Sequence, residues 1–178
     1  MTDADALLRF EQAVLPHLDA AHNLARWLLR DRHDAEDIVQ HACLRAFRAF
    51  AAFRGEDARG WLLTIVRNSC FTELRRRGQH PMREIVGDDT PAPPGDRDGD
   101  PAAAMLRRLD REALAAAIEE LPALFRETFV LREMEQLSYQ QIADVTGVPI
   151  GTVMSRLARA RHRLQQALTG KVSASEER

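Results

Sequence analysis

The sequence contains little cysteine and no clustered catalytic groups, and each absence excludes a class of protein. Only two of its 178 residues are cysteines, Cys43 and Cys70, and they form no Cys-x-x-Cys pair and have no nearby histidine pair at metal-ligand spacing. We therefore expect neither a disulfide framework nor a structural zinc site, and we interpret both as ordinary buried thiols. No acid–base, nucleophile, phosphate-loop or metal-ligand constellation occurs in the sequence, so we expect a protein that is not an enzyme and needs no cofactor or metal.

A long apolar run is also absent. No segment approaches the roughly 20 consecutive apolar residues that a membrane-spanning helix requires. The N-terminus begins with acids and lacks the basic flank and apolar core of a signal peptide. On these grounds we expect a cytoplasmic protein with no direct membrane insertion.

Strand-like alternation of apolar and polar residues is absent as well. Apolar residues instead recur at three- and four-residue spacing from about Ala4 to Arg77 and again from about Ala102 to Leu168, which predicts helices. Between these stretches, residues 78–101 are rich in proline, glycine and aspartate, which is typical of an exposed linker that buries little apolar surface. The sequence therefore predicts an all-α protein in four parts: a helical domain at 1–80, a flexible acidic linker at 81–104, a smaller helical domain at 105–170 and a polar tail at 171–178.

The formal net charge of -2 conceals a strong asymmetry. Residues 156–171 carry five basic side chains and no acid, whereas residues 84–100 carry six acids and one arginine. A protein that binds nucleic acid needs only a basic face, because affinity comes largely from displacing counterions along the phosphate backbone. All but one of the 25 basic residues are arginine, whose planar fork suits phosphate and guanine edges, although a GC-rich genome would enrich arginine equally.

The segment from Leu137 to Arg161 has the pattern of a helix-turn-helix, a unit that usually binds the DNA major groove. Ser138 can cap the first helix, Gly147 supplies the permissive backbone of the turn, and Pro149 opens the second helix. Two neighbouring sides of the second helix differ in character. The side expected to pack carries Val153, Leu157, Ala160 and Leu164. The side expected to meet DNA carries Thr152, Arg156, Arg159 and Arg163.

Two helices of the first domain carry acids, arginines and a tryptophan whose role, structural or binding, the sequence pattern alone does not decide. The stretch from Asp34 to Gln40 starts a helix with acids in its first turn, where the macrodipole favours them, so capping and solvation explain these acids without any binding role. A second helix begins after Asp57 and ends in the arginine run at 75–77. Trp61 can stack on a base, but a tryptophan at helical spacing more often packs in a core. The arginines can bind phosphate or can simply form the solvated end of a helix.

Four short motifs follow one another along the chain. They are Asp34-Ala-Glu-Asp-Ile-Val-Gln40, then Phe53-Arg-Gly-Glu with Trp61-Leu-Leu-Thr-Ile-Val-Arg-Asn68, then Leu121-Pro122 with Phe129-Val-Leu-Arg132, and last the helix-turn-helix. In this order, with an acidic linker after the second motif, they resemble the extracytoplasmic-function (ECF) group of bacterial sigma factors in the sigma-70 family. The resemblance covers nearly the whole chain, and four motifs in the right order at the right length make it highly specific.

The resemblance implies a promoter-specificity subunit of RNA polymerase that has no chemistry of its own. Residues 1–80 would form the sigma-2 domain, which docks on core polymerase and engages the promoter -10 element, and residues 105–170 would form the sigma-4 domain, which reads the -35 element. Tethering two weak contacts raises the overall affinity by effective concentration, a use that suits a flexible linker. The resemblance also implies an anti-sigma partner, often membrane-anchored, that holds the chain inactive.

Three sets of site residues are implied by the same resemblance. Contact with the clamp of the largest polymerase subunit is expected from Asp34, Glu36, Asp37 and Gln40. The -10 element is expected to meet Arg54, Trp61, Thr64, Arg67, Asn68, Arg75 and Arg76. The -35 element is expected to meet Thr152, Ser155, Arg156 and Arg159, with Arg161 and Arg163 on the DNA backbone or in packing.

Two positions depart from the family pattern. His41 follows Gln40, where the family commonly has glutamate. Gly60 precedes Trp61, whereas primary sigma factors have two adjacent aromatic residues where duplex melting starts. A single aromatic residue implies weaker intrinsic melting and therefore a stringent dependence on a good promoter sequence.

Two other functions fit parts of the sequence. A stand-alone helix-turn-helix repressor or activator would bind operators as a dimer without polymerase. It would need an oligomerisation surface and usually a ligand-binding or receiver domain, and the sequence shows neither. A sigma mimic that only titrates an anti-sigma protein usually carries an extra regulatory domain, for which we find no room in the chain.

Overall fold

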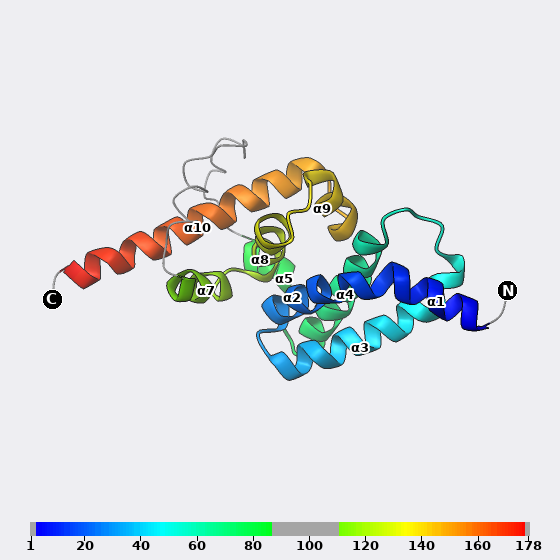
Figure 1. Ribbon diagram of the computed structural model, residues 1–178. Coiled ribbons are helices and arrows are strands. Elements are labelled where there is room, and N and C mark those ends of the chain that lie inside the picture. The colour runs from blue at the N-terminus through cyan, green and yellow to red at the C-terminus, as the bar shows by residue number, and fades with distance from the viewer. Residues whose placement is uncertain (1–2, 87–110, 177–178) are drawn as a thin grey trace. The chain divides into compact units, whose positions relative to one another are not determined.

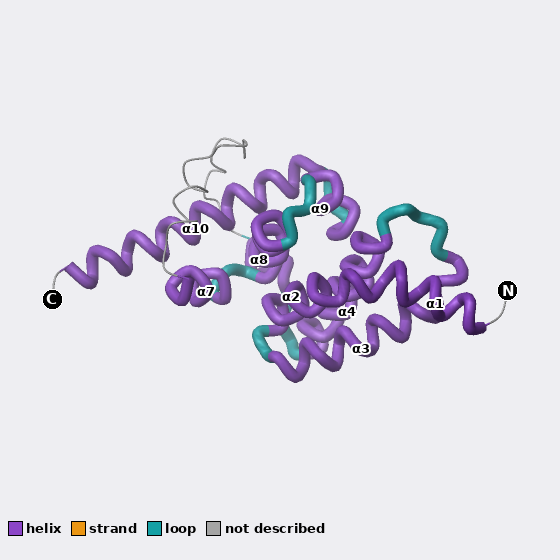
Figure 2. The backbone as a smooth tube through the Cα atoms, in the orientation of Figure 1, coloured by secondary structure: helices purple, strands orange, loops and turns teal. Residues whose placement is uncertain are grey.

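The computed structural model describes residues 3–86 and 111–176, and the regular structure within these two ranges is entirely helical (Figure 1, Figure 2). The described chain divides into two compact units, one formed mainly by residues up to 80 and the other mainly by residues from 81 onward. The prediction of an all-α protein with two helical domains is therefore confirmed. Residues 87–104, which make up most of the predicted linker, lie outside the described residues.

The first unit consists of four main helices joined in part by two short 3-10 turns (Figure 1). The helices are α1 (Asp3–Val14), α2 (Leu18–Leu29), α3 (Arg32–Ala49) and α4 (Ala58–Arg76), and the turns are Leu15–His17 and Phe50–Ala52. Helices α2, α3 and α4 pack against one another, and α1 packs against α4. Apolar residues every three or four positions turn one stripe of each helix inward. The core of the unit includes Leu24, Leu28, Val39, Leu62, Leu63 and Val66.

Side-chain caps set the starts of α3 and α4. Asp31 Oδ1 accepts a hydrogen bond from the backbone N–H of Asp34 at 2.9 Å, and Asp57 Oδ1 accepts one from the Gly60 N–H at 2.8 Å. Such caps satisfy N–H groups that have no acceptor inside the helix. Helix α3 therefore starts at Arg32, two residues before the predicted start, because Asp31 rather than Asp34 supplies the cap.

The described residues from 81 onward form five helices and one π-helical turn. The helices are α5 (Pro81–Ile85), α7 (Arg111–Glu119), α8 (Ala123–Phe129), α9 (Tyr139–Thr146) and α10 (Ile150–Glu176), and the π-helical turn is Val130–Met134. Helix α10 packs against α7 and α8, and α5 packs against α8. The fully buried side chains of this unit include Phe125, Leu131, Val153, Leu157, Ala160 and Leu164.

The structure differs from two predicted boundaries. Residues 81–85 form a helix where the linker is expected to begin, with Pro81 buried and Glu84 Oε2 accepting a hydrogen bond from the Ala123 N–H at 3.3 Å. Proline at a helix start fixes a φ that suits the first turn. Helix α10 continues to Glu176, through most of the predicted polar tail, because each residue added to an existing helix forms one more backbone hydrogen bond.

Both cysteines are free thiols. Cys70 is fully buried, as expected, whereas Cys43 is only half-buried, and burial raises the pKa of the Cys43 thiol. Within the two described ranges, His, Cys, Asp and Glu side chains form no group of three or more that could hold a metal ion. No helix of the described residues has the length and apolarity that crossing a membrane requires.

Candidate nucleic-acid interface

The helix-turn-helix consists of α9, the turn at Gly147 and α10. Ser138 Oγ accepts a hydrogen bond from the Gln141 N–H at 3.1 Å, and Gln141 Oε1 accepts one from the Ser138 N–H at 2.9 Å, so the two residues cap α9 reciprocally. Gly147 has a φ of 71°, a region that strains other residues, and the Pro149 carbonyl accepts the first backbone hydrogen bonds of α10. The predicted roles of Ser138, Gly147 and Pro149 are therefore confirmed.

The packing side predicted for α10 is confirmed, because all four of its members are fully buried: Val153, Leu157, Ala160 and Leu164. The neighbouring side carries half-buried side chains, namely Thr152, Ser155, Arg159 and Arg163. Arg156 is only 8% exposed, because it follows Val153 by three residues and precedes Ala160 by four and so borders the packing side. The structure therefore does not bring Arg156 to the open side of the helix with the other candidates.

Arg161 and Arg163 have different surroundings. The Arg161 guanidinium is buried and donates through Nη2 to Glu133 Oε1 in the π-helical turn, and burial lowers the pKa of Arg161. Arg163 is half-buried, with its guanidinium 5.4 Å from the centre of the Phe125 ring, which is a cation–π distance. Of the two roles expected for Arg161, contact with the DNA backbone and packing, its burial and its ion pair with Glu133 fit packing.

Four of the -10 candidates form one stripe on α4. Trp61, Thr64, Asn68 and Arg75 are separated by three, four and seven residues, which places them on one side of the helix. Trp61 is half-buried, and its ring centre lies 4.6 Å from that of Phe53, so part of the indole packs against another aromatic ring. Trp61, for which the sequence left both base stacking and core packing open, therefore packs against Phe53, while part of its surface stays exposed.

The other -10 candidates are engaged by neighbours. Arg54 Nη1 donates to the carbonyls of Ala51 and Phe53, at 2.5 and 3.0 Å. The Arg67 guanidinium lies 4.1 Å from the centre of the Phe71 ring. Arg76 donates to both carboxylate oxygens of Glu73, at 2.8 and 2.7 Å. These contacts fix the orientation of each arginine side chain. The ion pair with Glu73 also neutralises much of the charge of Arg76.

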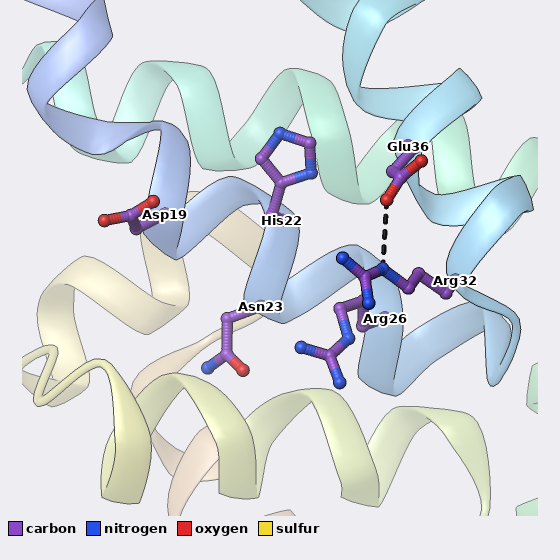
Figure 3. A pocket seen from close by; sticks show the side chains of 6 residues that line it. All are labelled: Asp19, His22, Asn23, Arg26, Arg32 and Glu36. Carbon is purple, nitrogen blue, oxygen red and sulfur yellow. Dashed lines mark hydrogen bonds and ion pairs between the residues drawn. The ribbon is translucent and has the colours of Figure 1, made fainter.

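The four candidates on α3 differ in exposure. Asp37 and Gln40 are exposed, whereas Asp34 and Glu36 are half-buried. Glu36 Oε1 accepts a hydrogen bond from Arg32 Nε at 3.1 Å (Figure 3). This pair helps to line a pocket of about 340 Å³ between α2 and the start of α3, whose other lining residues are Asp19, His22, Asn23 and Arg26. Because side chains of both charge signs line it, the pocket suits a polar group of a partner better than an apolar one.

Glu73 is the centre of an ion-pair network at the end of α4. It accepts hydrogen bonds from Arg76 and from Arg77 Nε, and these bonds, that of Arg76 first, lower the pKa of Glu73 to about 2. Arg77 Nη2 also donates to Asp34 Oδ2 at 2.7 Å, which joins the end of α4 to the first turn of α3. Arg77 belongs to the arginine run at 75–77 but is not among the predicted site residues. No local pattern marks its pair with Asp34, which lies 43 residues away.

Two family models match the chain. The model described as Sigma-70 region 2 matches residues 13–80, which contain α2, α3 and α4. The model described as Sigma-70, region 4 matches residues 111–164, which contain the helix-turn-helix. The first match covers the polymerase-binding and -10 candidates, and the second covers the -35 candidates.

Individual relatives agree with these matches. The chain is 34% identical over 166 residues to the ECF RNA polymerase sigma factor SigE of Mycolicibacterium smegmatis, covering 93% of this chain but only 64% of SigE. It is 34% identical over 165 residues to the RNA polymerase sigma-H factor of Pseudomonas aeruginosa, covering 89% of this chain and 86% of that protein. A similar solved structure is the sigma factor RpoE in complex with the anti-sigma factor NepR from Bartonella quintana. The TM-score is 0.68 and the sequence identity is 31%, and the match covers 90% of this chain and 97% of that chain.

Proposed function

Because the chain belongs to the extracytoplasmic-function group of the sigma-70 family, we propose that it is an alternative sigma factor, which binds core RNA polymerase and directs transcription initiation at promoters with matching -10 and -35 elements. The observation that carries this proposal is the presence, in one chain and in this order, of a region 2 helical unit and a region 4 helix-turn-helix. Sigma factors are not enzymes, so a role without catalysis is consistent with the family.

We assign -35 recognition to the first turns of α10. In a helix-turn-helix, the N-terminal residues of the second helix approach base edges in the major groove, while flanking basic groups fix the register on phosphates. Thr152, Ser155 and Arg159 lie on the open side of α10 and suit the first task, and Arg163 suits the second. The set contains neither Arg156 nor Arg161, because both side chains are buried.

We assign -10 engagement to the stripe on α4 and to the loop before it. The stripe offers an indole edge, a hydroxyl, an amide and a guanidinium on one side of the helix, which suits contact with the bases and backbone of a single strand. Extruding a base from the stack costs a few kcal/mol, which such contacts must offset. The members of this proposed surface are Arg54 in the loop, Trp61, Thr64, Asn68 and Arg75 in the stripe, and Arg67 and Arg76 on either side of the stripe.

Core polymerase binding is assigned to the exposed side of α3. Asp37 and Gln40 face solvent, Glu36 lines the polar pocket, and Asp34 presents a carboxylate in the first turn. Charged groups arranged in this way favour a partner surface of complementary charge. His41 is exposed next to Gln40, so this surface carries an imidazole where the family commonly has a carboxylate.

An anti-sigma factor is part of the proposal. The related RpoE structure is a complex with the anti-sigma factor NepR, and a partner of the same kind would keep this chain inactive by covering its polymerase- or DNA-binding surfaces. The protein would act in the cytoplasm, with the polymerase. A membrane-anchored partner would hold it at the membrane without any direct membrane insertion.

A stand-alone helix-turn-helix regulator is the other function drawn from the sequence, and no observation favours it. That function would use α9 and α10 alone. It would leave the region 2 match over residues 13–80 without a role.

Run-off transcription with purified bacterial core polymerase tests the proposal. The full chain plus core polymerase is expected to give a transcript from the promoter upstream of its own operon, whereas core polymerase alone gives none. A gel shift with the same DNA and no polymerase tests the alternative, because a stand-alone regulator would bind tightly as a dimer. Tight polymerase-free binding together with no transcript would overturn the proposal.

A further inference from the structure

We propose that Arg77 is a positioning residue for core polymerase binding: it acts through Asp34, whose carboxylate it holds in place at the start of α3. This inference rests on the proposed function, because it assigns a role within the polymerase-binding surface of α3. Arg77 itself lies at the end of a different helix, α4.

Arg77 bridges two carboxylates. Its Nη2 donates to Asp34 Oδ2 at 2.7 Å, and its Nε donates to Glu73 Oε1 at 2.8 Å. A planar guanidinium can make both bonds at once from a fixed fork, whereas an ammonium group lacks that geometry. The Arg77 and Asp34 side chains are 29% and 41% exposed, so water screens the pair and its contribution to folding stability is small. Folding stability therefore gives little reason for this ordered pair between Arg77 and Asp34.

The end of α4 fixes the backbone from which Arg77 projects. Gly78 has a φ of 80°, and its N–H donates to the Arg75 carbonyl at 2.9 Å, while the Gln79 N–H donates to the Leu74 carbonyl at 3.0 Å. These two bonds form a Schellman motif, which ends a helix with one left-handed residue. Leu74 is buried, so this helix end is anchored in the core.

Asp34 lies in the first turn of α3, ahead of the other proposed polymerase contacts on that helix, Glu36, Asp37 and Gln40. Arg77 holds one of the two Asp34 carboxylate oxygens, Oδ2, and so restricts the side chain to one arrangement before any partner arrives. A side chain that is already ordered loses less conformational entropy on binding. Loss of this order is expected to weaken binding by about three- to tenfold.

The test measures the affinity of the full chain for core polymerase in the absence of DNA. Arg77→Gln is expected to raise the dissociation constant by about three- to tenfold. Arg83→Gln makes the same change at an exposed arginine of α5 to which no role is assigned, and it is expected to bind as the wild type does. Arg77→Lys keeps the charge without the fork and is expected to bind with intermediate affinity. Arg77→Gln also removes one hydrogen bond to Glu73, but Arg76 still donates two, so the thermal unfolding temperature should fall only slightly.

A double-mutant cycle separates action through Asp34 from a general structural role. Asp34→Ala is expected to weaken binding, and adding Arg77→Gln to it is expected to have little further effect, because the carboxylate that Arg77 holds is already gone. Wild-type affinity in Arg77→Gln, or a full additional loss in the double variant, would overturn the inference. If the wild-type chain itself does not bind core polymerase, the proposed function fails instead.

Discussion

Arg161 in α10 forms a salt bridge with Glu133 in the π-helical turn that precedes the helix-turn-helix. The two side chains are 8% and 23% exposed, so the bridge is largely withdrawn from water. It ties the helix that carries the proposed -35 contacts to the turn before them. Arg161, expected either on the DNA backbone or in packing, therefore joins α10 to the π-helical turn.

Arg161→Met is expected to lower the free energy of unfolding by about 2–4 kcal/mol, because removing one partner of a buried ion pair is costly. Urea unfolding followed by circular dichroism measures this loss. The double variant Glu133→Gln with Arg161→Met is expected to recover part of it, since the ionised carboxylate is gone as well. Unchanged stability in Arg161→Met, combined with weaker -35 binding and a shallower salt dependence, would instead identify Arg161 as a phosphate contact.

Ser138→Ala removes the hydroxyl that caps α9. The expected loss is about 1 kcal/mol of unfolding free energy, because the Gln141 N–H loses its acceptor. Ser138→Asp keeps an acceptor at the same place and adds a charge that the helix dipole favours, so its stability should match that of the wild type. The same urea titration compares all three proteins, and equal stability of the alanine variant would show that the hydroxyl cap contributes nothing.

Gly147 and Gly151 lie four residues apart, and the same substitution is expected to act in opposite directions at the two sites. Gly147 has a φ of 71°, so Gly147→Ala should destabilise the protein by about 1 kcal/mol through its backbone conformation. Gly151 is helical, and apart from its chain neighbours and its own helix backbone no heavy atom lies within 4 Å of where its Cβ would be, so Gly151→Ala should stabilise by about 0.5 kcal/mol. Thermal unfolding measures the direction of the stability change in each variant. An equal loss of stability in both would contradict a helical conformation at Gly151.

The features that could be predicted from the sequence depend on residues close together in the chain. Ser138 and Gly147 act through residues up to four positions away, and the buried side of α10 is marked by apolar residues three or four positions apart. The partners of Arg77 and Arg161 lie 43 and 28 residues away. Periodicity places an arginine on a helix, but it does not show whether an acid from another element meets it.

The observed start of α3 differs from the predicted start for another reason. Asp31 lies three residues before the N–H that it caps, which is the ordinary spacing of an N-cap, so the sequence did contain this signal. The helix at residues 81–85 begins with Pro81, which suits a helix start but does not show that a helix forms there. Its packing depends on α8, and the Glu84 hydrogen bond to Ala123 spans 39 residues.

Glu73 gives the fold a pH dependence that one substitution should remove. Hydrogen bonds from Arg76 and then Arg77 lower the pKa of its carboxyl from 4.5 to about 2, so its contribution to stability is complete above pH 4.5 and is lost as the pH falls toward 2. Glu73→Gln cannot ionise, so it should be less stable than the wild type at pH 7, and this gap should narrow steadily from about pH 4.5 to about 2. Urea unfolding of both proteins across this range measures the gap. Glu56→Gln, at an exposed glutamate in the loop before α4, is the matched control for the change from glutamate to glutamine. A gap that stays constant into the acid range would mean that Glu73 stabilises the protein through packing rather than through its charge.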